Sequence, residues 1–370
     1  MKKNQLFSKL LSLSCSALLF AACANAGSAS DSSTASADGD LPEKVIIATL
    51  SMPNDEGIAK AEGYFEDEMG VPIEIVQFES GKEINQAMVS GAVDFGLTGS
   101  GSAVLGIASG IPIEMIWIHE TLGSVESLAA KSELNATSLA DLKGKNIGVP
   151  FASTAHYSLL RAITASGFEE SEFTLIDLQP SDIYAAWQRG DIDAAYIWEP
   201  TLSLLLEDGN IVLHSGDVAE MGYMTANVEI VRSAFGEAYP DLVAKYIASV
   251  DKAVTLYRED PDQAISIIAE HLNITEESAK LQMEGQNWIS AEEQLDAANL
   301  GTTDAVGSMA ATMLDMGQFY LDQGNITALP SAEAFADGIN TSFIEAYLDS
   351  KEWGEPACRG LMKEATERQW

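Results

Sequence analysis

The sequence is poor in cysteine, in basic residues and in long apolar runs, and each shortage excludes a class of protein. Of three cysteines in 370 residues, Cys15 and Cys23 lie near the N-terminus, which leaves Cys358 alone and without a disulfide partner. Lysine and arginine number 20 against 56 aspartates and glutamates, a net charge of −36. A nucleic-acid binder needs a basic face to neutralise phosphates, so that class is excluded. No apolar stretch reaches the ~18 residues of a membrane-spanning helix.

Motifs of common enzymes and metal sites are missing too. The four histidines, His119, His156, His214 and His271, are scattered, with no His-Glu-x-x-His or Cys-x-x-Cys pattern, so no metal site is predicted. There is no nucleophile elbow and no P-loop. The turn at 99–101 lacks the third glycine of a dinucleotide fingerprint, and it is better suited to present backbone N–H groups to a ligand. No catalysis and no cofactor are predicted.

What is present favours a folded, exported protein. Hydrophobic residues make up 46% of the chain, enough for a sizeable core, and the length suits two domains. Lys2, Lys3 and Lys9 precede an uncharged, mostly apolar run at 10–22, which has the length of a signal-peptide core. Small residues before Cys23 predict a lipobox, with Cys23 acylated as the first mature residue. The alternative is plain secretion with cleavage near 24–26. Residues 24–41 have the composition of a flexible tether.

Strand and helix patterns alternate along the body of the chain. Strands are predicted at 45–50, 73–78, 94–98, 111–118, 147–149, 173–178, 193–197 and 228–231. In the first part of the chain, helices are predicted at 54–68, 80–90, 153–165 and 181–189, and two more are predicted to start after residue 101 and at about residue 200. The C-terminal part is predicted to hold helices at 240–258, 261–271, 275–283, 302–322, 331–337 and 341–348. This alternation predicts two α/β units, each with a parallel sheet, followed by a helical C-terminal part. A cleft between such units would hold a ligand at the carboxyl ends of the strands.

The strongest local indication of a site is the run 149–160. A strand ends there, Ser153 and Thr154 follow, and a helix starts with His156 in its first turn. The unpaired N–H groups and partial positive charge of that turn suit an oxyanion. The alternative is an ordinary N-cap in which Ser153 or Thr154 serves only its own helix.

Several segments resemble the periplasmic taurine-binding proteins, which are solute receptors of sulfonate ABC importers and kin of the aliphatic-sulfonate and nitrate receptors. They are residues 153–157, 178–180 and 185–198, supported by 78–81, 99–100, 112–114 and 122–123. The likeness runs from about 44 to 348. It implies an α/β, two-lobed type II periplasmic solute-binding fold with a helical C-terminal part. Taken together with the N-terminal signals, the predicted organisation is a signal peptide at 1–22, a lipid-anchored tether at 23–41, lobe 1 at 42–149, lobe 2 at 150–228 and a return to lobe 1 at 229–348. Residues 349–370 are an extension beyond the family's usual end.

The resemblance also assigns binding residues. Ser153, Thr154 and His156 would hold the sulfonate, with Gly99 and Ser100 opposite on the other lobe. The chain departs from the family at Ala155, where a second threonine is usual. Ser51 is a further predicted ligand-binding residue.

The amine end departs from the family further. Asn227 stands where the family has an aspartate, and Glu229 where a tryptophan is usual. Glu120, Glu199 or Glu229 would then supply the negative charge, and Trp198 a π face for a cation. The alternatives are a helix-start acid for Glu199 and plain core packing for Trp198 and Trp187.

The sequence therefore predicts a monomeric, lipid-anchored receptor on the cell membrane, facing the periplasm or cell exterior. It would deliver a small sulfonate, taurine first, to an ABC permease. An alkyl sulfonate, nitrate or another small organic solute stays open as the ligand. Two other classes stay open: a thiamine-pyrimidine synthase-like enzyme, and a structural or adhesive lipoprotein. For the locally basic extension, self-docking, permease contact and disorder are all open.

Overall fold

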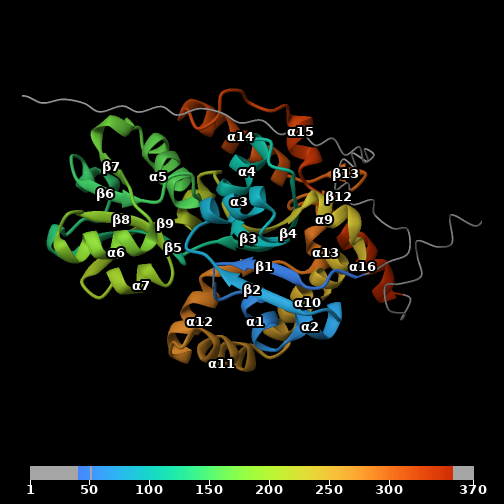
Figure 1. Ribbon diagram of the computed structural model, residues 1–370. Coiled ribbons are helices and arrows are strands. Elements are labelled where there is room, and N and C mark those ends of the chain that lie inside the picture. Colours follow the sequence, from blue (N-terminus) through green and yellow to red (C-terminus); the bar gives the residue numbers. More distant parts are fainter. Residues whose placement is uncertain (1–40, 51, 353–370) are drawn as a thin grey trace, which may run out of the picture. The chain divides into compact units, whose positions relative to one another are not determined.

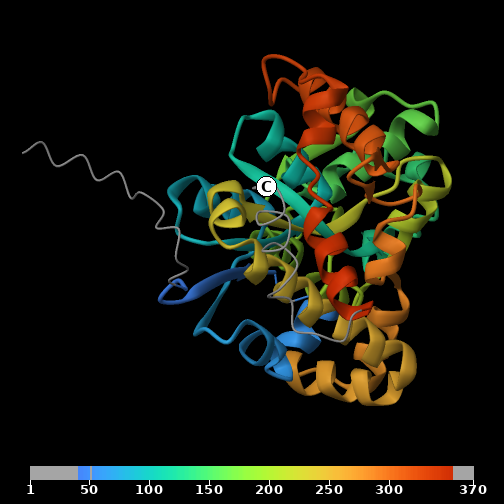
Figure 2. The same ribbon diagram turned by 90° about the vertical axis from the view of Figure 1, so that its right-hand side faces the viewer.

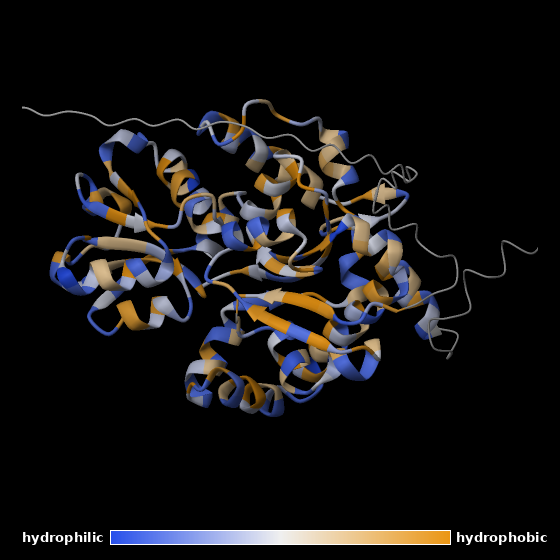
Figure 3. Ribbon diagram, viewed as in Figure 1, coloured by the Kyte–Doolittle hydropathy of each residue, from blue (hydrophilic) through white to orange (hydrophobic). Residues whose placement is uncertain are grey.

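The computed structural model describes residues 41–50 and 52–352, which build two main β-sheets with helices on their faces (Figure 1). The hydrophobic colour of Figure 3 runs along the interior strands, and the hydrophilic colour collects on loops and outer helix faces. The predicted α/β class is confirmed. The domain boundaries stay predictions.

The first sheet has the order β11-β4-β10-β3-β1-β2. Its strands are β1 (Val45–Thr49), β2 (Ile73–Gln77), β3 (Phe95–Gly99), β4 (Ile113–Leu122), β10 (Ala226–Arg232) and β11 (Gln286–Trp288). The four strands predicted for a parallel sheet, β1 to β4, all run in one direction, but the sheet as a whole is mixed. β1 is parallel to β2 and β3, but β10 lies antiparallel between β3 and β4. β10 brings the chain back from the second sheet, and it enters the first sheet from the opposite direction.

The second sheet repeats this pattern with the order β7-β6-β8-β5-β9. Its strands are β5 (Glu126–Lys131), β6 (Asn146–Val149), β7 (Thr174–Asp177), β8 (Ala194–Trp198) and β9 (Gly209–His214). β6 is parallel to β7 and β8, whereas β5 pairs antiparallel with β8 and β9. β5 and β9 were not predicted. The β5 sequence, Glu-Ser-Leu-Ala-Ala-Lys, has little intrinsic strand preference, and its two neighbouring strands make it a strand.

Helices cover both sheets largely where the sequence predicts them. In the first two thirds of the chain they are α1 (Asp55–Ala61), α2 (Tyr64–Met69), α3 (Gly81–Ser90), α4 (Ser100–Ala108), α5 (Thr154–Ala165), α6 (Pro180–Arg189), α7 (Thr201–Leu205), α8 (Ser215–Glu220) and α9 (Ser233–Ala238). The single helix predicted over 54–68 is two helices. Gly63 separates them with a left-handed backbone (φ +71°), which ends α1 and redirects the chain into α2.

The C-terminal third is helical and packs back on the first sheet. It comprises α10 (Pro240–Glu259), α11 (Pro261–Leu272), α12 (Glu276–Glu284), α13 (Ala291–Gln294), α14 (Met309–Asp322), α15 (Ala332–Asp337) and α16 (Ser342–Glu352). The last helices, red in Figure 2, run over earlier parts of the chain: α14 packs on α4 and α16 on α10. The helix predicted from 302 begins at Met309, because β12 (Gly301–Thr302) and β13 (Ala305–Val306) form a short hairpin first.

A stack of three aromatic rings joins the C-terminal part to the first sheet. Tyr246 of α10 lies between Phe65 of α2 and Phe95 of β3, with centroid distances of 5.0 and 4.6 Å. Over residues 41–50 and 52–352, no helix has both the length and the apolar composition needed to cross a bilayer.

Candidate ligand pocket

A pocket lies where the end of β3 in the first sheet meets the start of α5 beside the second. Its lining is formed by Leu50, Met52, Gly81, Gly99, Ser102, Leu122, Glu126, Ser153, Thr154, Trp198 and Asn227. The cavity has a volume of ≈ 20 Å³, room for about one water molecule. A small organic ligand therefore needs the two sheets and their helices to move apart before it enters.

Three helices begin at this pocket. Gly81 is the first residue of α3, Gly99 is the N-cap of α4, and Ser153 is the N-cap of α5. Each helix start offers N–H groups without an intrahelical acceptor and roughly half a positive charge. The convergence of three such ends makes a local environment suited to an anion.

The absence of a side chain at Gly81 and Gly99 lets Thr98 and Thr154, respectively, lie close to the backbone at these helix starts. A Cβ added to Gly81 would lie 2.0 Å from Oγ1 of Thr98, which is shorter than any non-bonded contact between these atoms allows. A Cβ added to Gly99 would lie 2.9 Å from Cγ2 of Thr154. The second contact joins the two halves of the pocket, so any larger residue at position 99 pushes α4 and α5 apart.

The hydroxyls predicted to bind the anion are engaged within the protein. Ser153 Oγ donates to the Pro150 carbonyl oxygen at 2.6 Å and accepts from the N–H of His156 at 3.2 Å. Thr154 Oγ1 donates to Glu126. Ser153 is thus an N-cap, and contact of either hydroxyl with an anion stays a prediction. The backbone N–H groups of the helix starts are the donors that remain in position.

His156 is buried behind the start of α5 and is not part of the pocket lining. Its ring stacks on Phe151 at 4.2 Å and meets the edge of Phe319 at 5.5 Å. Burial lowers the pKa of His156 to about 4, so the imidazole is neutral at physiological pH. The structure does not bring it together with Ser153 and Thr154 at the pocket surface, and its role in anion binding stays a prediction.

Glu126 is a pocket residue that the sequence analysis missed. It is 1% exposed, and its carboxylate accepts hydrogen bonds from Thr154 and, at 2.7 Å, from Ser215. Burial raises the pKa of Glu126 to about 7. A buried carboxylate beside three helix starts is suited to a cationic group held close to an anionic one. In the sequence, the one feature that could have indicated Glu126 is that it is the single charged residue in the stretch 122–130.

Asn227 and Glu120 form a polar wall at one side of the pocket. Asn227 of β10 lines the pocket and donates to Glu120 at 2.6 Å. The second oxygen of Glu120 accepts from Asn54 at 3.1 Å. Burial raises the pKa of Glu120 to about 7. Ser100 is buried as well, and its hydroxyl accepts from the N–H of Ala226, which ties the start of α4 to β10.

The remaining predicted residues divide between pocket and scaffold. Trp198 lines the pocket. Glu199 does not, and its two oxygens accept from the N–H and hydroxyl of Ser203 at 3.0 and 2.9 Å, as a helix-start acid does. Trp187 is a fully buried core residue. Ser51 and Cys23 lie outside the described residues.

Two α/β sheets of the same strand pattern with a pocket between them are the fold of the periplasmic binding proteins. The chain belongs to the NMT1/THI5-like family, whose pattern it matches over residues 57–264. It is 31% identical over 307 residues to the taurine-binding periplasmic protein of Escherichia coli K12, covering 81% of this chain and 92% of that protein.

Solved structures share the fold. The alkanesulfonate-binding protein of Xanthomonas axonopodis pv. citri, bound to MOPS, superposes with a TM-score of 0.66 at 19% identity, covering 82% of this chain and 100% of that one. The periplasmic aliphatic sulphonate binding protein of Escherichia coli gives 0.64 at 19% identity, covering 79% and 97%. The resemblance and fold inferred from the sequence are confirmed. All three relatives carry names of binding proteins, not enzymes.

Proposed function

We propose that this protein is the extracytoplasmic receptor of an ABC importer for a small sulfonate, with taurine as the favoured ligand. The observation that carries the proposal is the pocket in which three helix starts and the Glu126 carboxylate face one small space. Taurine carries a sulfonate and an ammonium on a two-carbon link. Its two charges match these two features.

The chemistry of the pocket fits reversible binding. A sulfonate is anionic at any physiological pH, so neutral N–H donors and helix dipoles suffice to hold it. A site without arginine also releases the anion more readily to a permease. Beside the start of α5, Glu126, which accepts from Thr154, would pair with the ammonium, and Trp198 would offer its ring face to the same cation.

An alkyl sulfonate is the second candidate, and one observation favours it. Leu50, Met52 and Leu122 form an apolar part of the lining, which would accept a hydrocarbon tail as well as the short chain of taurine. Ligand preference therefore depends on whether the carboxylate or the apolar wall contributes more.

A thermal-shift screen of the purified protein tests both candidates. Taurine, ethanesulfonate, ethylamine, nitrate and sulfate would be compared at equal concentration. A ligand at 100 times its Kd stabilises the folded state by about 2.7 kcal/mol. We expect the largest shift with taurine, a smaller one with ethanesulfonate and none with ethylamine. A shift with nitrate alone, or with none of the sulfonates, would refute the proposal.

Membrane attachment through Cys23 is the second part of the proposed function. Replacing Cys23 by serine removes the thiol that accepts the lipid, and the protein is then expected in the soluble extracytoplasmic fraction. Cell fractionation with immunoblotting measures this, and Cys15→Ser serves as the matched control that leaves anchoring intact. Membrane retention of Cys23→Ser at the wild-type level would contradict the anchor.

A further inference from the structure

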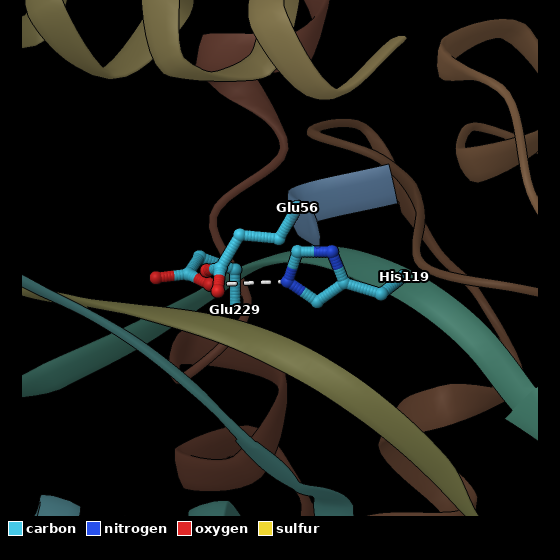
Figure 4. A group of neighbouring side chains, drawn as sticks. All are labelled: Glu56, His119 and Glu229. Carbon is cyan, nitrogen blue, oxygen red and sulfur yellow. Dashed lines mark hydrogen bonds and ion pairs between the residues drawn. The ribbon is translucent and has the colours of Figure 1, made fainter. Parts of the chain in front are cut away.

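Beneath the pocket wall lies a second group of polar side chains that the proposed function does not use. Glu56 of α1, His119 of β4 and Glu229 of β10 each direct one ligand-type atom into a common space, and these atoms all lie within 4.8 Å of one another (Figure 4). The side chains are 2%, 0% and 0% exposed. They come from segments far apart in the sequence, so no motif indicates them.

The histidine is oriented as a metal ligand is. Its Nδ1 lies 2.6 Å from Oδ1 of Asp55, and the other oxygen of Asp55 accepts from Trp117 Nε1 at 2.9 Å. In the neutral tautomer whose Nδ1–H donates to Asp55, the Nε2 lone pair would face Glu229 Oε2, which lies 3.0 Å from it. Metal-bound histidines almost always donate their other N–H to a carboxylate or carbonyl in this way.

One carboxylate oxygen in the group lacks a partner. The Tyr246 hydroxyl lies 3.0 Å from Oε2 of Glu56, to which it donates, and it is also within reach of Glu229, so its single proton serves two carboxyl groups. Oε1 of Glu229 is fully buried and accepts no hydrogen bond from the described residues. Among residues 41–50 and 52–352, no lysine or arginine forms an ion pair with Asp55, Glu56 or Glu229, and His119 is the basic side chain beside Asp55 and Glu229. Three buried carboxyl groups thus face one imidazole, and a buried group of this kind is held together either by shared protons or by a bound cation.

We propose that Glu56, His119 and Glu229 bind a divalent transition-metal ion, with Zn²⁺ the best match to one imidazole and two carboxylates. Zinc takes such nitrogen and oxygen ligands at about 2.0–2.2 Å. Two donors on one tetrahedral ion then lie roughly 3.3 Å apart, close to the 3.0 Å between His119 Nε2 and Glu229 Oε2.

The ion would be structural, and it would act on the pocket from behind. It joins α1, β4 and β10, and β10 carries Asn227 into the pocket lining two residues before Glu229. Glu120, next to His119, holds Asn227 from the other side. Because all three ligands are buried, the metal enters as the chain folds and leaves slowly afterwards.

Elemental analysis of the untagged protein tests the site. After gel filtration we expect about one zinc per chain in the wild type. Glu229→Gln keeps the shape of the side chain but weakens one ligand, and it should lose the stoichiometric metal. Asp251→Asn, at a buried carboxylate outside the cluster, should keep it. Equal metal content in the wild type and Glu229→Gln would overturn the proposal.

Refolding supplies a readout that does not depend on a variant. Protein unfolded in chelator and refolded without metal should show a Tm lower by roughly 5 °C or more, and added Zn²⁺ during refolding should restore it. Refolding with Co²⁺ should give the visible absorption of a bound cobalt ion. A native fold with no cobalt spectrum and no Tm response to Zn²⁺ would mean that shared protons alone hold the cluster. That result would leave the sulfonate proposal intact, because the thermal-shift screen tests it separately.

Discussion

Replacing Glu126 by glutamine is expected to weaken taurine binding ten- to a hundredfold and to leave ethanesulfonate binding unchanged or tighter. The amide still accepts from Ser215 and still meets the Thr154 hydroxyl, so the lining keeps its shape. What is lost is the negative charge opposite the ammonium. A hydrogen bond to a charged group contributes about 1.5–3 kcal/mol, which corresponds to this change in Kd. Isothermal titration calorimetry with both ligands measures it.

The same carboxylate should make binding depend on pH, with opposite signs for the two ligands. Burial raises the pKa of Glu126 to about 7, so the group is mostly protonated below that pH and ionised above it. Taurine should bind more tightly as pH rises through 7, because its ammonium pairs with the carboxylate. Ethanesulfonate should bind more weakly over the same range, because the new charge repels it. Glu126→Gln should reduce both slopes to the part contributed by Glu120 behind Asn227, whose pKa burial also raises to about 7.

Stability provides the control for this variant. A carboxyl whose folded pKa lies above its unfolded value stabilises the native state at low pH, and this contribution is lost as pH rises from about 4.5 towards 7. Glu126→Gln should therefore unfold at the same or a higher temperature than the wild type above pH 7. Equal loss of both ligands in a well-folded variant would contradict an ammonium role for Glu126.

Replacing Gly99 by alanine is expected to weaken every sulfonate ten- to a hundredfold without unfolding the protein. The added methyl group would lie 2.9 Å from Cγ2 of Thr154, across the contact between the starts of α4 and α5. The backbone of Gly99 has φ −68°, which alanine adopts without strain. The cost, about 1–3 kcal/mol of overpacking, therefore arises only when the two halves of the pocket close. Calorimetry gives the affinity, and small-angle scattering with saturating ligand gives the closure.

A second substitution tests whether the clash is the cause. Thr154→Ser removes Cγ2 and keeps the hydroxyl that donates to Glu126. In the Gly99→Ala background it should restore most of the lost affinity and the ligand-induced compaction, while Thr154→Ser alone should bind nearly as the wild type does. Wild-type affinity in Gly99→Ala would show that ligand is held with the halves further apart than in this structure.

Local patterns in the sequence determined much of the scaffold. The β-branched run of β1, the strand–helix alternation and the helix start at Ser153 depend on residues close together in the chain, where periodicity and capping act. The same local signals pointed to Gly99, Ser153 and Thr154, which the structure brings together in one pocket lining. They predict one helix over 54–68 where the structure has two, because a glycine within a helical pattern does not by itself reveal the left-handed backbone that Gly63 adopts.

Only the tertiary structure decided which side chains meet. β5 is a strand because β8 and β9 flank it, and that pairing places Glu126 in the pocket. The insertion of β10 between β3 and β4 brings Asn227 to the lining and Glu229 to His119. The hydroxyl of Thr154 donates to Glu126, a residue that is distant in the sequence. Glu199 accepts from Ser203 nearby, and this depends on the direction of its side chain. Hydropathy and local spacing carry no information about such contacts, because they arise when separate segments of the chain pack together.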